Sequence, residues 1–220
     1  LNPEGDEAKT SLSDLYLLMG MNEEAMETVT VPGEKASILA YTGKQTEALE
    51  LISENMQPFD QIVVHYYLRD FATVLSLLRS IQPMQTGPLN ELVPGLIYWY
   101  AITTYFYSSA DHADAPARIA KLDEYFGAKS PEGIESEDGL LAWAVYQIIK
   151  NNPDAAYFSI DKLIDRGIVN KILDEPPFDG LRETPEFKHY YAKMEKNRVR
   201  HRNSIKAQLA DPKPNWIQSR

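Results

Sequence analysis

The sequence predicts an all-α protein built from antiparallel pairs of short helices. Apolar residues recur at helical spacing, as at Leu12, Leu15, Tyr16 and Met19, which is the buried stripe of an amphipathic helix. A turn-forming residue follows this stripe, as Gly20 does. A small residue then lies nine positions after a large one across each turn, and this lets two helices approach closely.

Composition excludes several other classes of protein. The 220 residues are 44% apolar and 25% charged, which is typical of a globular protein with a sizeable core. The absence of cysteine excludes disulfides, thiolate metal sites and a cysteine nucleophile. No run approaches the roughly 20 apolar residues that cross a bilayer. Because the chain begins without Met, we expect it to be a piece of a longer protein or the product of processing.

The first two helix pairs have glycine at their turns. We expect the helix over residues 11–19 to end at Gly20, with Asn22 capping its partner. The same pattern returns over residues 38–52, where Gly43 makes the turn.

The third pair, over residues 61–75, is less regular. The β-branched and aromatic side chains of residues 61–67 would suit a strand, but their position in the repeat favours a helix. We expect Asp70 to cap the second helix, and Leu68 stands where the earlier pairs have glycine.

Further helices are predicted toward the C-terminus. Residues 89–107 are apolar around most of the helix circumference, and Pro94 marks either the start of this helix or a kink. Pro153 suits the first turn of a later helix, and Gly167 suits its end. The predicted helices cover residues 89–107, 113–126, 137–150 and 153–166.

A polar link over residues 127–138 suggests an internal boundary. We expect residues 1–127 to form N-terminal helical repeats. Residues 128–220 would form a helical pair, a capping segment rich in Pro and Phe, and a basic last helix. The two parts are expected to be continuous.

The paired pattern resembles the tetratricopeptide repeat (TPR) family. The match departs from the family in its period, because Gly20 and Gly43 are 23 residues apart whereas the family repeats every 34 or so. The resemblance implies a right-handed α-α superhelix of antiparallel helix pairs, closed by a C-terminal capping helix. The residues on signature positions are Leu12, Ser13, Tyr16, Gly20, Ala25 and Val29 in the first unit, and Leu140, Trp143, Ala144, Ala156, Ile160 and Leu163 in a late unit.

Residues 173–187 strengthen this resemblance. They are similar to the segment Asp-Pro-x-Phe-x-x-Leu-Arg-x-x-Pro-x-Phe that closes bacterial TPR regions. Its prolines interrupt a helix, and Phe178, Leu181 and Phe187 are expected to plug the open apolar end of the stack. Such regions lie C-terminal in bacterial transcriptional regulators and nucleotide cyclases. The resemblance implies a periplasmic location if the parent is membrane-anchored, and a cytoplasmic one otherwise.

The resemblance also implies a function, that of a non-catalytic protein-interaction or sensory module. A peptide or protein partner would bind in the concave groove of the superhelix. The groove candidates are Asp14, Leu17, Ser37, Ala40, Ile62, His65, Tyr98, Tyr105, Val145 and Ile148.

The aromatic run from Tyr98 to Tyr107 supports an alternative function. Most of its rings are expected in the core, but neighbours on a helix point in different directions, so some rings face outward. Outward rings could serve a small-ligand-binding or catalytic helical domain, or could drive homo-oligomer formation.

No enzyme or metal motif accompanies these patterns. The four histidines include no His-x-x-x-His pair, and neither a Gly-x-Ser-x-Gly motif nor a phosphate loop occurs. The segment Asp111-His112-Ala113-Asp114 offers metal-ligand types, but aspartate before a helix is the ordinary cap. We therefore predict no catalytic residue, metal ligand or cofactor.

The charge distribution is uneven. The chain carries a formal charge of −10, which disfavours nucleic acid and anionic lipid as partners. Residues 188–206 are instead rich in Lys and Arg and are expected to form a solvated helix folded back on an acidic body. Contact of this helix with nucleic acid or lipid is the less favoured alternative. This basic tail includes Lys193, Lys196, Arg198, Arg200 and Arg202.

Overall fold

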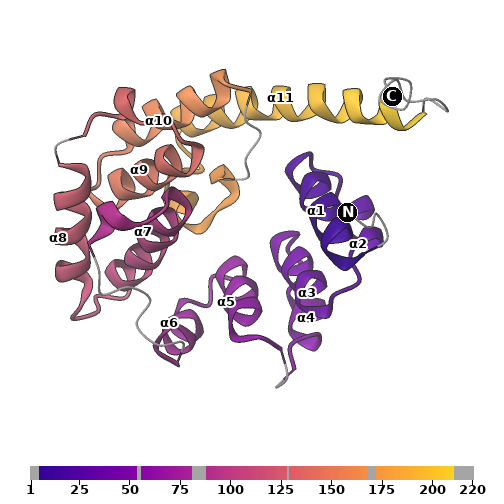
Figure 1. Cartoon of the computed structure of the whole chain (residues 1–220), viewed down its shortest axis with the longest axis horizontal. Coiled ribbons are helices and arrows are strands. Elements are labelled where there is room, and N and C mark those ends of the chain that lie inside the picture. Colours follow the sequence, from indigo (N-terminus) through magenta and orange to yellow (C-terminus); the bar gives the residue numbers. More distant parts are fainter. Residues whose placement is uncertain (1–4, 54–55, 81–87, 128, 168–171, 211–220) are drawn as a thin grey trace.

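A computed structural model describes residues 5–53, 56–80, 88–127, 129–167 and 172–210. Within these ranges all regular structure is helical, so the prediction of an all-α protein is confirmed (Figure 1). The α-helices are α1 (Asp6–Leu18), α2 (Asn22–Thr28), α3 (Pro32–Tyr41), α4 (Gln45–Glu50), α5 (Pro58–Tyr67), α6 (Phe71–Ser80), α7 (Pro94–Ser109), α8 (Ala115–Phe126), α9 (Glu137–Ile149), α10 (Pro153–Asp165) and α11 (Pro185–Ala210); short 3-10 helices are η1 (Leu89–Glu91), η2 (Pro131–Gly133), η3 (Ile172–Asp174) and η4 (Pro176–Leu181).

The first ten α-helices form five pairs, and the turn within each pair contains one residue with left-handed backbone. Only glycine adopts this conformation without a steric cost, which for other residues is about 1–2 kcal/mol. In the third pair Arg69 takes it, whereas Leu68, at the position predicted from the glycines, stays right-handed. The five turn residues are Gly20 (φ 69°), Gly43 (φ 82°), Arg69 (φ 61°), Asp111 (φ 48°) and Asn151 (φ 55°).

Two other local predictions have different outcomes. Asn22 does not cap α2, because it is the first residue of that helix and Met21 precedes it without a side-chain hydrogen bond. Asp70 does cap α6, since its Oδ1 accepts a hydrogen bond from the backbone N–H of Thr73 at 3.2 Å. Residues 61–67 lie within α5, so the helix prediction for them is confirmed.

The later helices start close to their predicted positions. Pro94 is the first residue of α7, and η1 precedes it as a separate turn, so this proline marks a start and not a kink. Helix α8 begins at Ala115, two residues after the predicted start. Pro153 is the first residue of α10, and Gly167 (φ 79°) follows its end.

One hydrophobic core extends from Ala36 in α3 to Met194 in α11, past the boundary expected at residue 127. Helix α9 packs between α7 and α10, and its apolar circumference is buried. Phe126 of α8 stacks on Tyr146 of α9 with ring centroids 5.1 Å apart. Aromatic packing therefore joins the two sides of this boundary.

Helix α11 returns from the last helix pair to the first. It leaves α10 and runs along one side of the row of helices to the α1–α2 pair, as Figure 1 shows in yellow. There Arg202 Nε donates to the carbonyl of Met19 at 2.9 Å, and Ile205 packs on Met19 and Met21. The side chain of Lys206 lies 3.8 Å from Glu24. The two ends of the row are thus bridged by one helix.

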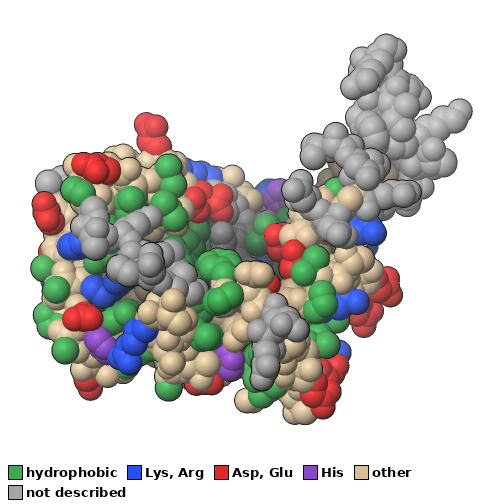
Figure 2. Space-filling view, turned by 60° about the horizontal axis from the view of Figure 1, so that its bottom comes forward, with side chains coloured by type: hydrophobic (Ala, Val, Ile, Leu, Met, Phe, Trp, Pro, Cys, Tyr) green, Lys and Arg blue, Asp and Glu red, His purple; other side chains and the backbone are tan. Residues whose placement is uncertain are grey.

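None of the described helices is long and apolar enough to span a lipid bilayer. On the face in Figure 2, acidic, basic and hydrophobic side chains are intermingled.

Candidate functional site

The inner-face pocket, of about 230 Å³, lies between the first helices of the first three pairs. Each helix contributes residues spaced three or four apart, because such residues share one face of a helix. The pocket is lined by Thr10, Ser13, Asp14 and Leu17 of α1, by Glu34, Ser37, Ile38 and Tyr41 of α3, and by Asp60, Val63 and Tyr67 of α5.

The inner-face pocket is acidic. Asp14, Glu34 and Asp60 line it, whereas none of its lining residues is Lys, Arg or His. The hydroxyl of Thr10 donates to the Glu34 carboxylate at 2.8 and 2.9 Å and fixes its position. Carboxylates beside an apolar floor and tyrosine rings suit a cationic group with an aliphatic stem.

A glycine sets the distance between two walls of this pocket. A Cβ atom on Gly33 of α3 would lie 2.6 Å from Asp60 Oδ2 of α5. The two helices approach this closely because the glycine has no side chain. The missing side chain of Gly33 therefore leaves room for the Asp60 carboxylate to lie against α3, beside the pocket.

The predicted groove residues divide into three groups. Asp14, Leu17 and Ser37 line the inner-face pocket. On α5 the pocket is lined by Asp60, Val63 and Tyr67 in place of the predicted Ile62 and His65, because the helix presents a face turned by one or two residues. The other predicted positions that are buried in the core are Ala40, Ile62 and Val145.

The remaining predicted groove residues have other contacts. His65 is mostly buried, and its Nδ1 lies 3.1 Å from the Asp70 carboxylate. Ile148 is half-buried on α9. The hydroxyls of Tyr98 and Tyr105 bind residues 172–182, which we call the inner segment. Because these rings bind the protein's own chain, the aromatic run contributes packing in this structure.

The inner segment contacts the inner faces of several successive helices and does not cover one end of the row. Phe178 is fully buried. The carboxylate of Glu175 accepts hydrogen bonds from Tyr66 of α5 at 2.6 Å and from Tyr98 of α7 at 2.5 Å. Burial, and then the charge of Glu175, raise the pKa of both tyrosines well above its usual value. Their neutral hydroxyls therefore remain donors to this carboxylate.

Arg69 anchors the other end of the inner segment. Its guanidinium makes two hydrogen bonds of 2.9 Å with Asp179 and a third, of 3.1 Å, with the carbonyl of Asp174. Arg182 binds the same Asp179 carboxylate at 2.9 Å. Burial raises the pKa of Asp179, but the hydrogen bonds from Arg69 and Arg182 outweigh it and hold the pKa below its usual value.

A second cavity, the arginine pocket, lies where the inner segment and α11 meet the turns of the first three pairs. Its volume is about 470 Å³. Tyr41 lines both this cavity and the inner-face pocket. The arginine pocket is lined by Gly20, Asn22, Tyr41, Thr42, Arg69, Asp174, Arg182, Tyr191, Glu195, Arg198 and Arg202.

Most described cations of the basic tail contact the protein itself. Lys193 binds Asp161 at 2.5 Å and Asp165 at 2.6 Å on α10. Arg198, with 4% of its side chain exposed, binds Asp174 and Glu195. These pairs fit a helix folded on an acidic body, and they leave Lys196 and Arg200 exposed on α11.

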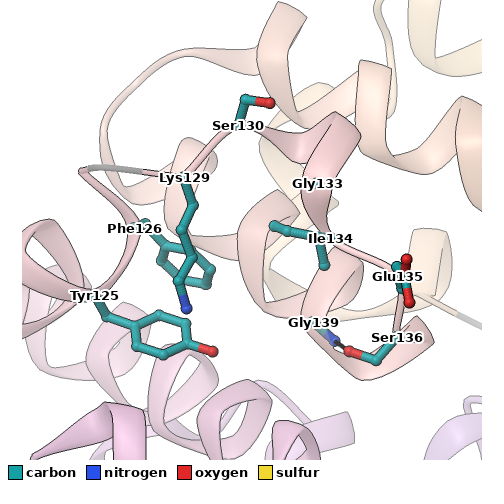
Figure 3. Close-up of a pocket in the computed structure, with 9 residues that line it drawn as sticks. All are labelled: Tyr125, Phe126, Lys129, Ser130, Gly133, Ile134, Glu135, Ser136 and Gly139. Atoms are coloured by element: carbon teal, nitrogen blue, oxygen red, sulfur yellow. Dashed lines mark hydrogen bonds between the residues drawn. The ribbon is translucent and has the colours of Figure 1, made fainter.

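A third cavity, of about 620 Å³, lies between the end of α8 and the start of α9 (Figure 3). The ammonium of Lys129 lies over the ring of Tyr125, 3.3 Å from its centroid. The hydroxyl of Ser136 accepts from the backbone N–H of Gly139 at 3.2 Å. The Lys129 ammonium and the Ser136 hydroxyl therefore have partners within the chain.

Among the described residues, no group of three His, Asp or Glu side chains could hold a metal ion. The ring of His112 is engaged at both nitrogens, because Nδ1 accepts from the backbone N–H of Asp114 at 3.1 Å and Nε2 lies 2.6 Å from Arg79. Asp114 occupies the cap position of α8 without a side-chain capping bond.

Sequence reasoning did not find the arginine pocket. Arg69 and Arg182 lie outside the basic tail and have no shared motif. The repeat spacing pointed to Leu68 as the turn residue of the third pair, whereas in the structure Arg69 takes the left-handed conformation there. Comparison with family models, with curated proteins and with solved structures found no match to this chain.

Proposed function

We propose that the chain is a non-catalytic protein-interaction module, a TPR-like superhelix whose inner-face pocket receives a basic side chain of a peptide or protein partner. The observation that carries this proposal is the row of three carboxylates, Asp14, Glu34 and Asp60, contributed by the first helices of three consecutive pairs.

The helix pairing supports the TPR-like part of the proposal. Five pairs follow one another, and each reverses direction at a residue with positive φ, which is glycine in the first two. Repetition of one helix-turn-helix unit is what a solenoid requires. The short spacing between units and the inner segment on the concave side distinguish it from a regular repeat.

The pocket chemistry favours Lys or Arg as the bound side chain. Its volume of about 230 Å³ suits one side chain and not a whole folded element. An aliphatic stem would contact Leu17 and Val63, and its charged end would meet Asp14 or Asp60. A partner would therefore insert one basic residue and lie along the helix faces on either side.

The test is selection of random peptides against the 220-residue chain, followed by affinity measurement. We expect the selected peptides to be enriched in Lys and Arg. Asp14→Asn and Asp60→Asn should each weaken binding about tenfold, as loss of a charge-assisted contact predicts. Glu47→Gln, an exposed change on α4, is the matched control and should leave affinity unchanged. Selected peptides that bind all three variants equally would contradict the proposal.

Small-ligand binding is a second candidate function. The arginine pocket favours it, because its volume of about 470 Å³ lies in the range of pockets for small molecules.

A further inference from the structure

The arginine pocket brings together four guanidinium groups from distant parts of the sequence. Arg69 follows α5, Arg182 follows η4, and Arg198 and Arg202 lie one helical turn apart on α11. Like charges collected in one cavity repel one another, and this repulsion costs free energy unless negative groups offset it. The nearby carboxylates therefore decide whether the pocket is neutral.

The carboxylates around this pocket are fewer than the arginines. Asp179 is shared by Arg69 and Arg182. Asp174 and Glu195 both pair with Arg198. Within the described part of the chain Arg202 has no ion-pair partner, and its Nε donates to the neutral carbonyl of Met19. Three carboxylates therefore face four arginines, and Arg202 is the arginine among them that has no carboxylate partner within the described residues.

A buried donor in the same pocket also lacks an acceptor. The side chain of Arg198 is only 4% exposed. Its Nε atom is buried and has no hydrogen-bond partner. A buried N–H group without an acceptor is unfavourable, so a ligand that brings an oxygen to it gains affinity. The guanidinium of Arg202 without a carboxylate partner and the unpaired Nε–H of Arg198 both favour a ligand with anionic oxygens.

The neighbouring groups define the class of ligand. Guanidinium groups match the paired oxygens of carboxylates and phosphates, which they bind through two parallel hydrogen bonds. Asn22, Thr42 and Tyr191 add neutral polar groups to the wall. A cavity of about 470 Å³ is larger than a single inorganic ion needs, so a small organic molecule fits it better.

We propose that the arginine pocket binds a small molecule with two or more carboxylate or phosphate groups, one of which lies against Arg202 and Arg198. Because Asn22 belongs to α2 and Arg202 to α11, the ligand contacts both sides of the junction between the first pair and the last helix. Its occupancy stabilises that junction. This inference rests on the second candidate function, small-ligand binding in the arginine pocket. The site is separate from the proposed peptide site, so either one can fail without the other.

The test is isothermal titration of the 220-residue chain with three probes: inorganic phosphate, pyrophosphate and citrate. We expect saturable binding of at least one polyvalent probe, tighter than that of inorganic phosphate. Comparison of pyrophosphate with citrate distinguishes phosphate from carboxylate recognition. Absence of saturable binding by both polyvalent probes overturns the proposal.

Two pairs of variants locate the binding. Arg202→Gln should weaken it about tenfold or more, whereas Arg200→Gln, an exposed arginine on the same helix, should leave it unchanged. Asn22→Asp places a negative charge in the pocket at a helix start where aspartate is favourable, so the protein stays folded while affinity falls. Gln45→Glu, at the first position of α4, is its control. Equal losses in a variant and its control would mean non-specific attraction and overturn the proposal.

Discussion

The guanidinium of Arg69 and the carboxylate of Asp179 are joined by two hydrogen bonds of 2.9 Å, although 110 positions separate them along the chain. Arg69 makes this pair from a left-handed backbone conformation, with φ at 61°. For a residue other than glycine this conformation costs about 1–2 kcal/mol, which the surrounding structure has to offset. The pair fastens the inner segment to the end of α5.

The backbone and side-chain contributions of Arg69 can be separated by two substitutions. Arg69→Ala loses the ion pair and keeps the unfavourable φ, whereas Arg69→Gly loses the ion pair but relieves the backbone. We expect Arg69→Gly to be more stable than Arg69→Ala by about 1 kcal/mol. Urea unfolding followed by circular dichroism measures the difference. Equal stabilities would mean that the turn relaxes to a right-handed form.

The low pKa of Asp179 predicts an acid-dependent loss of stability. Because its pKa is lower in the folded protein, Asp179 stabilises the fold fully above its unfolded pKa of about 4. This contribution is lost as the pH falls through the folded value. Asp179→Asn should lower the free energy of unfolding by about 1–2 kcal/mol at neutral pH. The effect is modest because the side chains of Arg69 and Asp179 are each about a third exposed to solvent. The difference in free energy of unfolding between the wild type and Asp179→Asn, measured by urea titration, should become smaller below about pH 4.

Two turn glycines form a matched pair for substitution. Gly20 and Gly43 both have positive φ, so alanine at either position costs about 1 kcal/mol through the backbone. A Cβ on Gly20 would also lie 3.2 Å from Arg202 Nη2, whereas one on Gly43 would meet nothing within 4 Å. We expect Gly20→Ala to lower the melting temperature more than Gly43→Ala. In the Arg202→Ala background this difference should disappear.

The carboxylate of Glu175 is expected to be important for stability through its two tyrosine donors. Glu175→Ala removes the acceptor that Tyr66 and Tyr98 share and should cost about 2–5 kcal/mol. Glu175→Gln keeps one oxygen that can accept a hydrogen bond from a tyrosine, so its loss of stability should be smaller. Chemical denaturation of both variants gives the comparison. An alanine variant as stable as the glutamine variant would show that the tyrosines find other acceptors.

The raised tyrosine pKa values predict instability at alkaline pH. Tyr66 and Tyr98 stay neutral in the folded chain, but in the unfolded chain they ionise near pH 10. Their contribution to stability is therefore present below about pH 10 and is lost as the pH rises further. The free energy of unfolding should fall between about pH 9 and pH 11, and the double variant Tyr66→Phe/Tyr98→Phe should show a shallower fall. Tyrosinate absorbance should rise together with unfolding.

Local sequence signals were sufficient for most helices and turns. Gly20 and Gly43 have the left-handed conformation that their positions suggested, and Pro94 and Pro153 begin the helices in which they were noticed. Each of these outcomes depends on the steric properties of one residue. Arg69 is different, because a long-range partner stabilises a conformation that the residue type alone disfavours.

The placement of the inner segment could not be predicted from the sequence. Its prolines and Phe178 indicated an irregular apolar segment, but Glu175 contacts Tyr66 across 109 positions and Asp174 contacts Tyr41 across 133. Which helices such a segment contacts depends on the curvature of the whole row. For the same reason the sequence indicated Asp14 and Ser37 as groove residues without revealing Asp60 beside them.

Helix α11 fixes the distance between the first and the last helix pair. With 26 residues it is about 39 Å long, and an α-helix resists both stretching and compression. Its contacts with α10 at one end and with the α1–α2 turn at the other set the span between the outermost pairs. Any change that widened or narrowed the row would therefore have to break the contacts of this helix at one of its two ends.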